Sequence, residues 1–152
     1  MQCPACTAGR KGFTLIEVLI VILVIAVLAS IVVPRLLMAG RKSKEAVLRD
    51  TLRGLRLGIA TFQADTGVYP LDLADLTVTA APDQGVDELG NVRAINAGDF
   101  RGPYFINPNG GLPEDPISEA TDWDYSTTPP HVGDVHSSAA GTTLEGMAYG
   151  EL

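Results

Sequence analysis

A single carboxylate, Glu17, lies near the start of an apolar run, residues 13–33, and its position demands a chemical explanation. An ionised side chain at the centre of a lipid bilayer costs about 3 kcal/mol on insertion scales, so its burial requires a compensating cation. At about 1.5 Å of rise per residue, the run is long enough to cross a hydrocarbon core of about 30 Å. We therefore interpret Glu17 as one half of an ion pair in apolar surroundings.

The other reactive side chains form no recognisable catalytic set. Cys3 and Cys6 make one C-x-x-C pair, which supplies two of the four ligands that zinc requires, so we interpret the pair as incidental. His131 and His136 are the only histidines. Strand alternation would place Ser137 on the face opposite His136, which excludes a Ser-His-Asp arrangement. The sequence predicts a protein that is not an enzyme.

Charge is divided sharply along the chain, which has 152 residues and a net charge of −7. Residues 35–56 carry seven basic and two acidic side chains, a net charge of +5. Residues 57–152 carry two basic and fifteen acidic side chains, a net charge of −13. The acidic part would repel phosphate, so we expect no nucleic-acid partner.

The elements that must position these residues are a long helix and a small head. After Pro34, large apolar residues recur at steps of four and three, which predicts a helix with one buried stripe. The stripe consists of Leu48, Leu52, Leu55, Ile59 and Phe62. Gly67 and Pro70 are typical of a helix end. We predict an α+β fold in which a helix over 13–66, transmembrane in its first half, packs its stripe against a small antiparallel sheet in the head, 67–152.

Strand-like segments in the head are short and separated by long loops. The pattern predicts strands at 102–106, 123–127 and 133–138, with the Pro-rich turn 128–133 between the last two.

Three features of the helix carry further predictions. Glu45 precedes Arg49 by four residues, a spacing that favours a local ion pair. The helix also carries a basic stripe, which we expect to face either solvent or the acidic heads of neighbouring copies: Lys42, Arg49, Arg53 and Arg56. Pro34 predicts a kink or an unwound turn between Ala26 and Pro34 when the helix packs among others.

Three interpretations fit the apolar run. As a secretory signal peptide, it would follow the basic pair Arg10–Lys11 and be cut near Ala29, although it is longer than usual and contains Glu17. As a plain membrane anchor, its strongly basic downstream flank would place the head in the cytoplasm. The third interpretation rests on the order of the residues.

The segment "KGFTLIEVLI" resembles the processing site of the type IV pilin and type II secretion pseudopilin superfamily. The resemblance implies that residues 1–12 are a cytoplasmic leader, that a prepilin peptidase cleaves between Gly12 and Phe13, and that Phe13 becomes N-methylated. Glu17 and Pro34 stand where the family has its glutamate and proline. In a filament of staggered helices, Glu17 of one copy would meet the new amino terminus of another and fix the register of assembly.

Weaker motifs in the head narrow the resemblance. "DTGVYP", "GPYFINPNGGLPEDP" and "TDWDYSTT" look most like the major pseudopilin of type II secretion. That likeness implies a single-pass protein of the bacterial inner membrane, with its head in the periplasm or outside, that forms a helical homo-oligomeric filament. Its implied partners are the prepilin peptidase, an inner-membrane assembly platform and minor pseudopilins. Two alternatives remain: a major type IV pilin of a surface pilus for adhesion, motility or DNA uptake, and a membrane-anchored binding module that never polymerises.

The same likeness implies calcium in a loop near the C-terminus, and no other cofactor. The corresponding stretch here is poor in acidic residues. The candidate ligands are Asp115, Asp122, Asp124 and Glu145, whose order does not fit an EF-hand.

Overall fold

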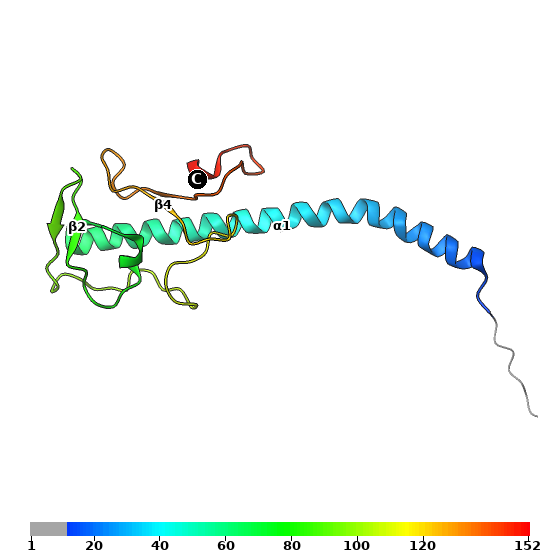
Figure 1. Ribbon diagram of the computed structural model, residues 1–152, viewed down its shortest axis with the longest axis horizontal. Helices are drawn as coiled ribbons and strands as arrows, with labels where there is room; N and C mark the ends of the chain where they lie inside the picture. The colour runs from blue at the N-terminus through cyan, green and yellow to red at the C-terminus, as the bar shows by residue number, and fades with distance from the viewer. Residues whose placement is uncertain (1–11) are drawn as a thin grey trace, which may run out of the picture. The chain divides into compact units, whose positions relative to one another are not determined.

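The computed structural model describes residues 12–152, so the interpretation of Cys3 and Cys6 lies outside the described part. The chain divides into two units, one ending at Gly40 and one comprising Arg41–Leu152. The long helix α1 (Leu15–Thr66) contributes residues to both (Figure 1). The predicted α+β class, a long N-terminal helix with small antiparallel sheets, is confirmed.

In the first unit, α1 is apolar over residues 18–33 apart from Ser30. Pro34 lies inside α1 without interrupting it, although proline has no N–H to donate to the preceding turn. The one hydroxyl in this stretch of the helix, that of Ser30, donates to the carbonyl oxygen of Val27 at 2.7 Å, so it needs no water. The kink predicted near Pro34 concerns helices packed among copies and stays a prediction.

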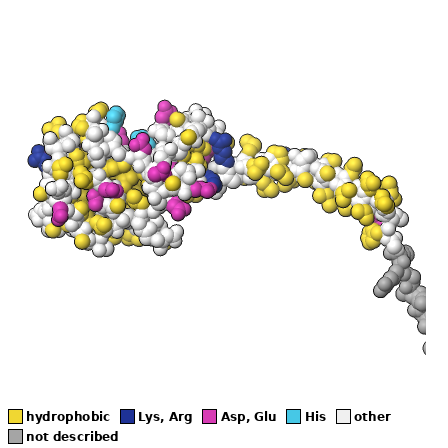
Figure 2. Space-filling model, in the orientation of Figure 1, with side chains coloured by type: hydrophobic (Ala, Val, Ile, Leu, Met, Phe, Trp, Pro, Cys, Tyr) yellow, Lys and Arg dark blue, Asp and Glu magenta, His cyan; other side chains and the backbone are white. Residues whose placement is uncertain are grey.

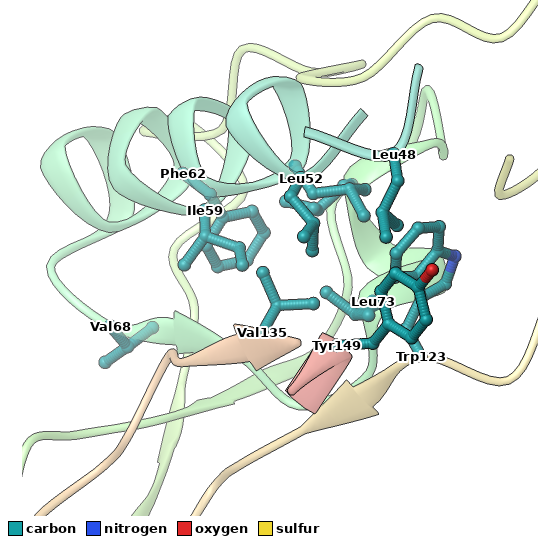
Figure 3. Close-up of a cluster of buried hydrophobic side chains, with 11 residues drawn as sticks. Leu48, Leu52, Ile59, Phe62, Val68, Leu73, Trp123, Val135 and Tyr149 are labelled. Carbon is teal, nitrogen blue, oxygen red and sulfur yellow. The ribbon is translucent and has the colours of Figure 1, made fainter. Parts of the chain in front are cut away.

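In the second unit, the predicted stripe of α1 forms the core. All five of its side chains are at most 3 % exposed. They form one cluster with buried residues of the head, of which Figure 3 labels all but Leu76: Val68, Leu73, Leu76, Trp123, Val135 and Tyr149. The prediction that the stripe covers the chain's own head is confirmed. α1 ends as expected, because Gly67 adopts a positive φ of 76° and its N–H donates to Gln63 O at 2.8 Å.

The head contains two small antiparallel sheets. A meander joins β1 (Tyr69–Pro70), β2 (Gln84–Val86) and β3 (Val92–Ala94), and β4 (Asp124–Tyr125) pairs with β5 (Val135–His136). Two short 3₁₀ helices, η1 (Leu73–Leu76) and η2 (Tyr149–Glu151), complete the fold. β4 and β5 confirm two predicted strands in shortened form.

The strand predicted at 102–106 is wrong. The N–H groups of Tyr104 and Phe105 both donate to Leu76 O, at 2.8 and 2.9 Å, rather than to a neighbouring strand. Instead of a ladder, aromatic packing holds this segment. The rings of Phe62, Phe100 and Tyr104 meet edge to face, with centroids 5.3–6.1 Å apart.

The predicted Glu45–Arg49 pair is also wrong. Arg49 pairs with Glu145 of the head at 2.9 Å, whereas Glu45 turns inward and is only 2 % exposed. Arg56 likewise bonds within its own chain, donating to Val135 O at 2.9 Å. The other two residues of the predicted basic stripe, Lys42 and Arg53, are exposed, and Arg53 lies 4.0 Å from Asp50 on the same helix.

Candidate processing and assembly site

The segment before α1 is open to an external partner. Gly12, Phe13 and Thr14 have no helical or strand structure, and the Phe13 side chain is 82 % exposed. Among the residues that the structure describes, a Cβ added to Gly12 would meet no atom within 4 Å. Packing within residues 12–152 therefore gives no reason for glycine at this position.

Thr14 and Glu17 form the start of α1. The backbone N–H of Glu17 bonds to Thr14 Oγ1 at 3.3 Å and to Thr14 O at 3.1 Å. This is one half of a capping box, in which Thr-x-x-Glu satisfies free N–H groups at a helix start. A negative charge here is also favoured by the helix dipole. Sequence reasoning missed the role of Thr14, although the Thr-x-x-Glu pattern signals it.

Among the described residues, no cation pairs with the Glu17 side chain. None of the ion pairs among the described residues includes Glu17. The structure places Glu17 on the first turn of α1, one turn from Phe13, with both side chains exposed. The arrangement leaves the carboxylate free to accept a cation supplied from outside the helix.

The helix that carries Glu17 exposes a large apolar surface in the first unit. Nearly all side chains from Leu15 to Val33 are apolar and exposed, and Figure 2 shows them covering the visible face of this unit. Among the described residues, one helix, α1, contains a window long and apolar enough to cross a membrane. A helix that is apolar all round requires lipid or other helices around it.

The four candidate calcium ligands do not share interaction partners. Asp115 is buried and accepts bonds from Ser137 Oγ and from the N–H of Ile117 at 2.7 Å. Asp122 accepts from Ser118 Oγ at 3.4 Å, Asp124 is exposed on β4, and Glu145 binds Arg49. Within residues 12–152, no three His, Cys, Asp or Glu side chains are grouped to hold a metal ion.

The amino-acid sequence is similar to a known family motif and to known proteins. Residues 7–33 match the family model described as the prokaryotic N-terminal methylation motif. The chain is 32% identical over 111 residues to type II secretion system core protein G of Klebsiella pneumoniae, covering 70% of this chain and 69% of that protein. No solved structure matches the chain significantly.

Two further relatives match over shorter stretches. Type IV wide pilus major component PilA4 of Thermus thermophilus is 39% identical over 68 residues, 45% of this chain and 52% of that protein. Type II secretion system core protein G of Pseudomonas aeruginosa is 28% identical over 61 residues, 40% of this chain and 43% of that protein. The chain thus spans about half the length of these two relatives.

The processing motif, the apolar helix and the match to the Klebsiella protein together define the family. This chain belongs to the superfamily of type IV pilins and type II secretion pseudopilins.

Proposed function

We propose that this chain is the major structural subunit of a type II secretion pseudopilus, assembled through the apolar part of α1. The observation that carries the proposal is the segment of α1 over residues 18–33, whose side chains are exposed in the single subunit and apolar apart from Ser30, with Glu17 directly before it. Such a surface suits a membrane before assembly and the core of a filament afterwards. Relatives named type II secretion system core protein G support the secretion assignment.

Processing prepares the helix for assembly. Hydrolysis of the Gly12–Phe13 peptide bond by a prepilin peptidase releases the leader and leaves a cationic amine on Phe13. That amine is the cation that Glu17 lacks. When helices pack in parallel with an axial offset, Glu17 of one copy meets the amine of the next, and other offsets leave both charges unpaired. An unpaired buried charge costs several kcal/mol, so the pair selects one register.

The openness of Gly12 supports its role in processing. Since no atom of the described residues would meet a Cβ there, the presence of glycine fits recognition by a peptidase better than a packing requirement of the fold. The remaining partners that we propose are an inner-membrane assembly platform and minor pseudopilins. The head would lie in the periplasm, and the protein would act mechanically rather than as an enzyme.

Mass spectrometry of the chain from membranes of the native host tests this proposal. The expected mature chain begins at Phe13 and carries one methyl group on its amine. A Gly12→Val variant should keep the leader and remain in the membrane without entering filaments. A mature chain that begins at Ser30 would establish the signal-peptide interpretation instead.

The PilA4 match favours a second candidate, the major type IV pilin of a surface pilus. Both candidates use the same helix, so the location of the filament separates them. Immunogold electron microscopy of native cells should show label confined to the cell envelope for a pseudopilus. Long labelled fibres outside the cell would assign the chain to a surface pilus.

A further inference from the structure

The C-terminal loop, residues 141–149, closes on itself through protein groups. Thr142 and Ala148 form an antiparallel bridge, and the N–H of Thr143 donates to Met147 O at 2.7 Å. The Thr143 hydroxyl, which is buried, accepts from the N–H of Met147 at 3.2 Å. Gly146, with a positive φ of 88°, completes the turn. These bonds shape the loop but do not attach it to the helix.

Glu45 makes that attachment. Its Oε1 accepts bonds from the N–H of Leu144 at 2.9 Å and from the hydroxyl of Tyr149 at 3.1 Å, and it lies 3.4 Å from Arg41 Nε. Glu45 is therefore a buried carboxylate with three donors around it, which is the arrangement that a buried charge needs. Two of the donors belong to the C-terminal loop and lie 99 and 104 residues away along the chain.

Two neighbouring basic residues of α1 reinforce the same loop. The guanidinium of Arg41 donates to Thr142 O and lies 3.5 Å from the Tyr149 hydroxyl. About two turns further along the helix, Arg49 pairs with Glu145 at 2.9 Å. Glu145, a candidate calcium ligand, is thus already engaged by a cation.

The acidic residues do not fit a calcium site that would organise this loop. Calcium takes six to eight oxygen ligands, of which several are usually carboxylates. The oxygens of Asp115 are occupied by Ser137 and by the N–H groups that follow it, and Glu145 is paired with Arg49. Among the described residues, the carboxylate that accepts from a backbone N–H of the loop is that of Glu45 on the helix.

We propose that Glu45 is the positioning residue of the C-terminal loop and that it anchors the loop to α1 without a metal ion. The carboxylate holds the loop through its N–H and O–H donors, whereas calcium would hold a loop through its oxygen atoms. The head of this chain should therefore keep its fold and its C-terminal surface when divalent cations are removed. The proposal concerns the head alone and stands whether the filament is a pseudopilus or a pilus.

Hydrogen exchange of the full chain in detergent micelles tests the anchor. In Glu45→Ala, we expect the protection of the Leu144 amide to fall about tenfold or more, because a bond to a charged acceptor is lost. Glu45→Gln should restore part of that protection, since its amide oxygen can accept the same bond. The matched control is Asp50→Ala, which removes an exposed carboxylate from the same helix and should leave Leu144 unchanged. Unchanged protection in Glu45→Ala would overturn the proposal.

Thermal unfolding of the unaltered chain tests the absence of a metal requirement. The midpoint Tm should be the same with calcium chloride and with EGTA. A Tm that rises in calcium and falls in EGTA would overturn the proposal, whatever the variants do. If Glu45→Ala does not fold, Tyr149→Phe replaces it. That variant removes one donor to Glu45 and keeps the ring, and it should lower Leu144 protection while leaving the Tm independent of calcium.

Discussion

Glu17 carries two roles that a single substitution to alanine cannot separate. As the third residue of α1, Glu17 stands at the acidic position of a Thr-x-x-Glu capping box, where Thr14 Oγ1 accepts from its N–H. As a lone carboxylate on an apolar helix, it is also the proposed partner of the Phe13 amine of another copy. Glutamine serves in a capping box almost as well as glutamate but carries no charge.

We therefore predict that Glu17→Gln inserts into the membrane and is processed normally, yet yields filaments reduced by about 100-fold or more, because breaking a buried ion pair costs several kcal/mol. Electron microscopy and sedimentation of sheared filaments measure the yield, and membrane fractionation measures insertion. Asp50→Asn, which neutralises an exposed carboxylate outside the apolar segment, serves as the control. Normal filaments from Glu17→Gln would contradict the role of the charge in register.

Asp87 organises the turn between β2 and β3. Its carboxylate accepts from Arg93 Nε at 2.7 Å and from the N–H groups of Leu89 and Asn91 at 3.0 and 2.8 Å. The bond from Arg93 is the largest of these influences, and together they lower the pKa of Asp87 from 3.8 to about 2.

Because the folded pKa lies below the unfolded one, the contribution of Asp87 to stability is present above about pH 4 and is lost as the pH falls through about 2. We predict that Asp87→Asn lowers the Tm by a few degrees at neutral pH. The difference from the unaltered chain should shrink steadily between pH 4 and pH 2. Thermal unfolding monitored by circular dichroism across this range measures it. A difference that stays constant down to pH 2 would contradict the assignment to the Asp87 charge.

At the scale of elements, two glycines let the head approach α1 closely. A Cβ at Gly58 would lie 3.2 Å from the backbone oxygen of Tyr104, and one at Gly54 would lie 3.1 Å from the ring of Phe105. The two glycines are four residues apart, so they share one face of the helix. The backbone at Tyr104 is itself held, since its N–H bonds to Leu76 O.

We predict that Gly58→Leu destabilises the head by about 2 kcal/mol or more, because the side chain would push against a backbone carbonyl that cannot move freely. Gly40→Ala is the matched control on the same helix. A Cβ there meets nothing within 4 Å, so the gain in helix propensity should leave stability unchanged or slightly raised. Chemical denaturation of both variants measures the difference, and equal stabilities would contradict the proposed close approach.

The elements that the sequence predicts well are those encoded by local repetition. The stripe from Leu48 to Phe62 is regular over several turns, and its burial follows from that regularity. The sequence pattern does not predict the sheet β1–β2–β3, because its strands have only two or three residues. Its geometry depends on contacts distant in sequence, such as the place of Gly85, where a Cβ would lie 2.5 Å from Val68.

The same distinction applies to the two sites. Gly12, Phe13 and Glu17 lie within six consecutive residues, so a short motif suffices to identify them. Residue spacing could not predict the partners of Glu45. Leu144 lies 99 residues away, and Arg49, the partner expected from helix spacing, pairs with Glu145 of the head instead. Helix spacing indicates which pairs are close, whereas the tertiary fold decides which of them form.

At the scale of the whole molecule, the two units present contrasting surfaces. The first exposes an apolar helix, and the second buries its apolar stripe beneath a strongly acidic head. If the chain were a non-polymerising anchor, lipid alone would cover the apolar surface of the first unit. A filament subunit must instead pack that helix against other copies, at an axial offset set by the four-residue step from Phe13 to Glu17.

The offset makes a specific prediction for disulfide crosslinking. If Phe13 of one copy lies beside Glu17 of another, Thr14 lies beside Val18 of that second copy, because both pairs differ by four residues, or about 6 Å of rise. The proposed cleavage after Gly12 would remove Cys3 and Cys6, and residues 13–152 contain no cysteine. We expect cells that express Thr14→Cys and Val18→Cys together to give crosslinked dimers upon mild oxidation, and far fewer with either variant alone. A monomeric anchor gives none in any combination, and equal yields from the single variants would contradict the staggered register.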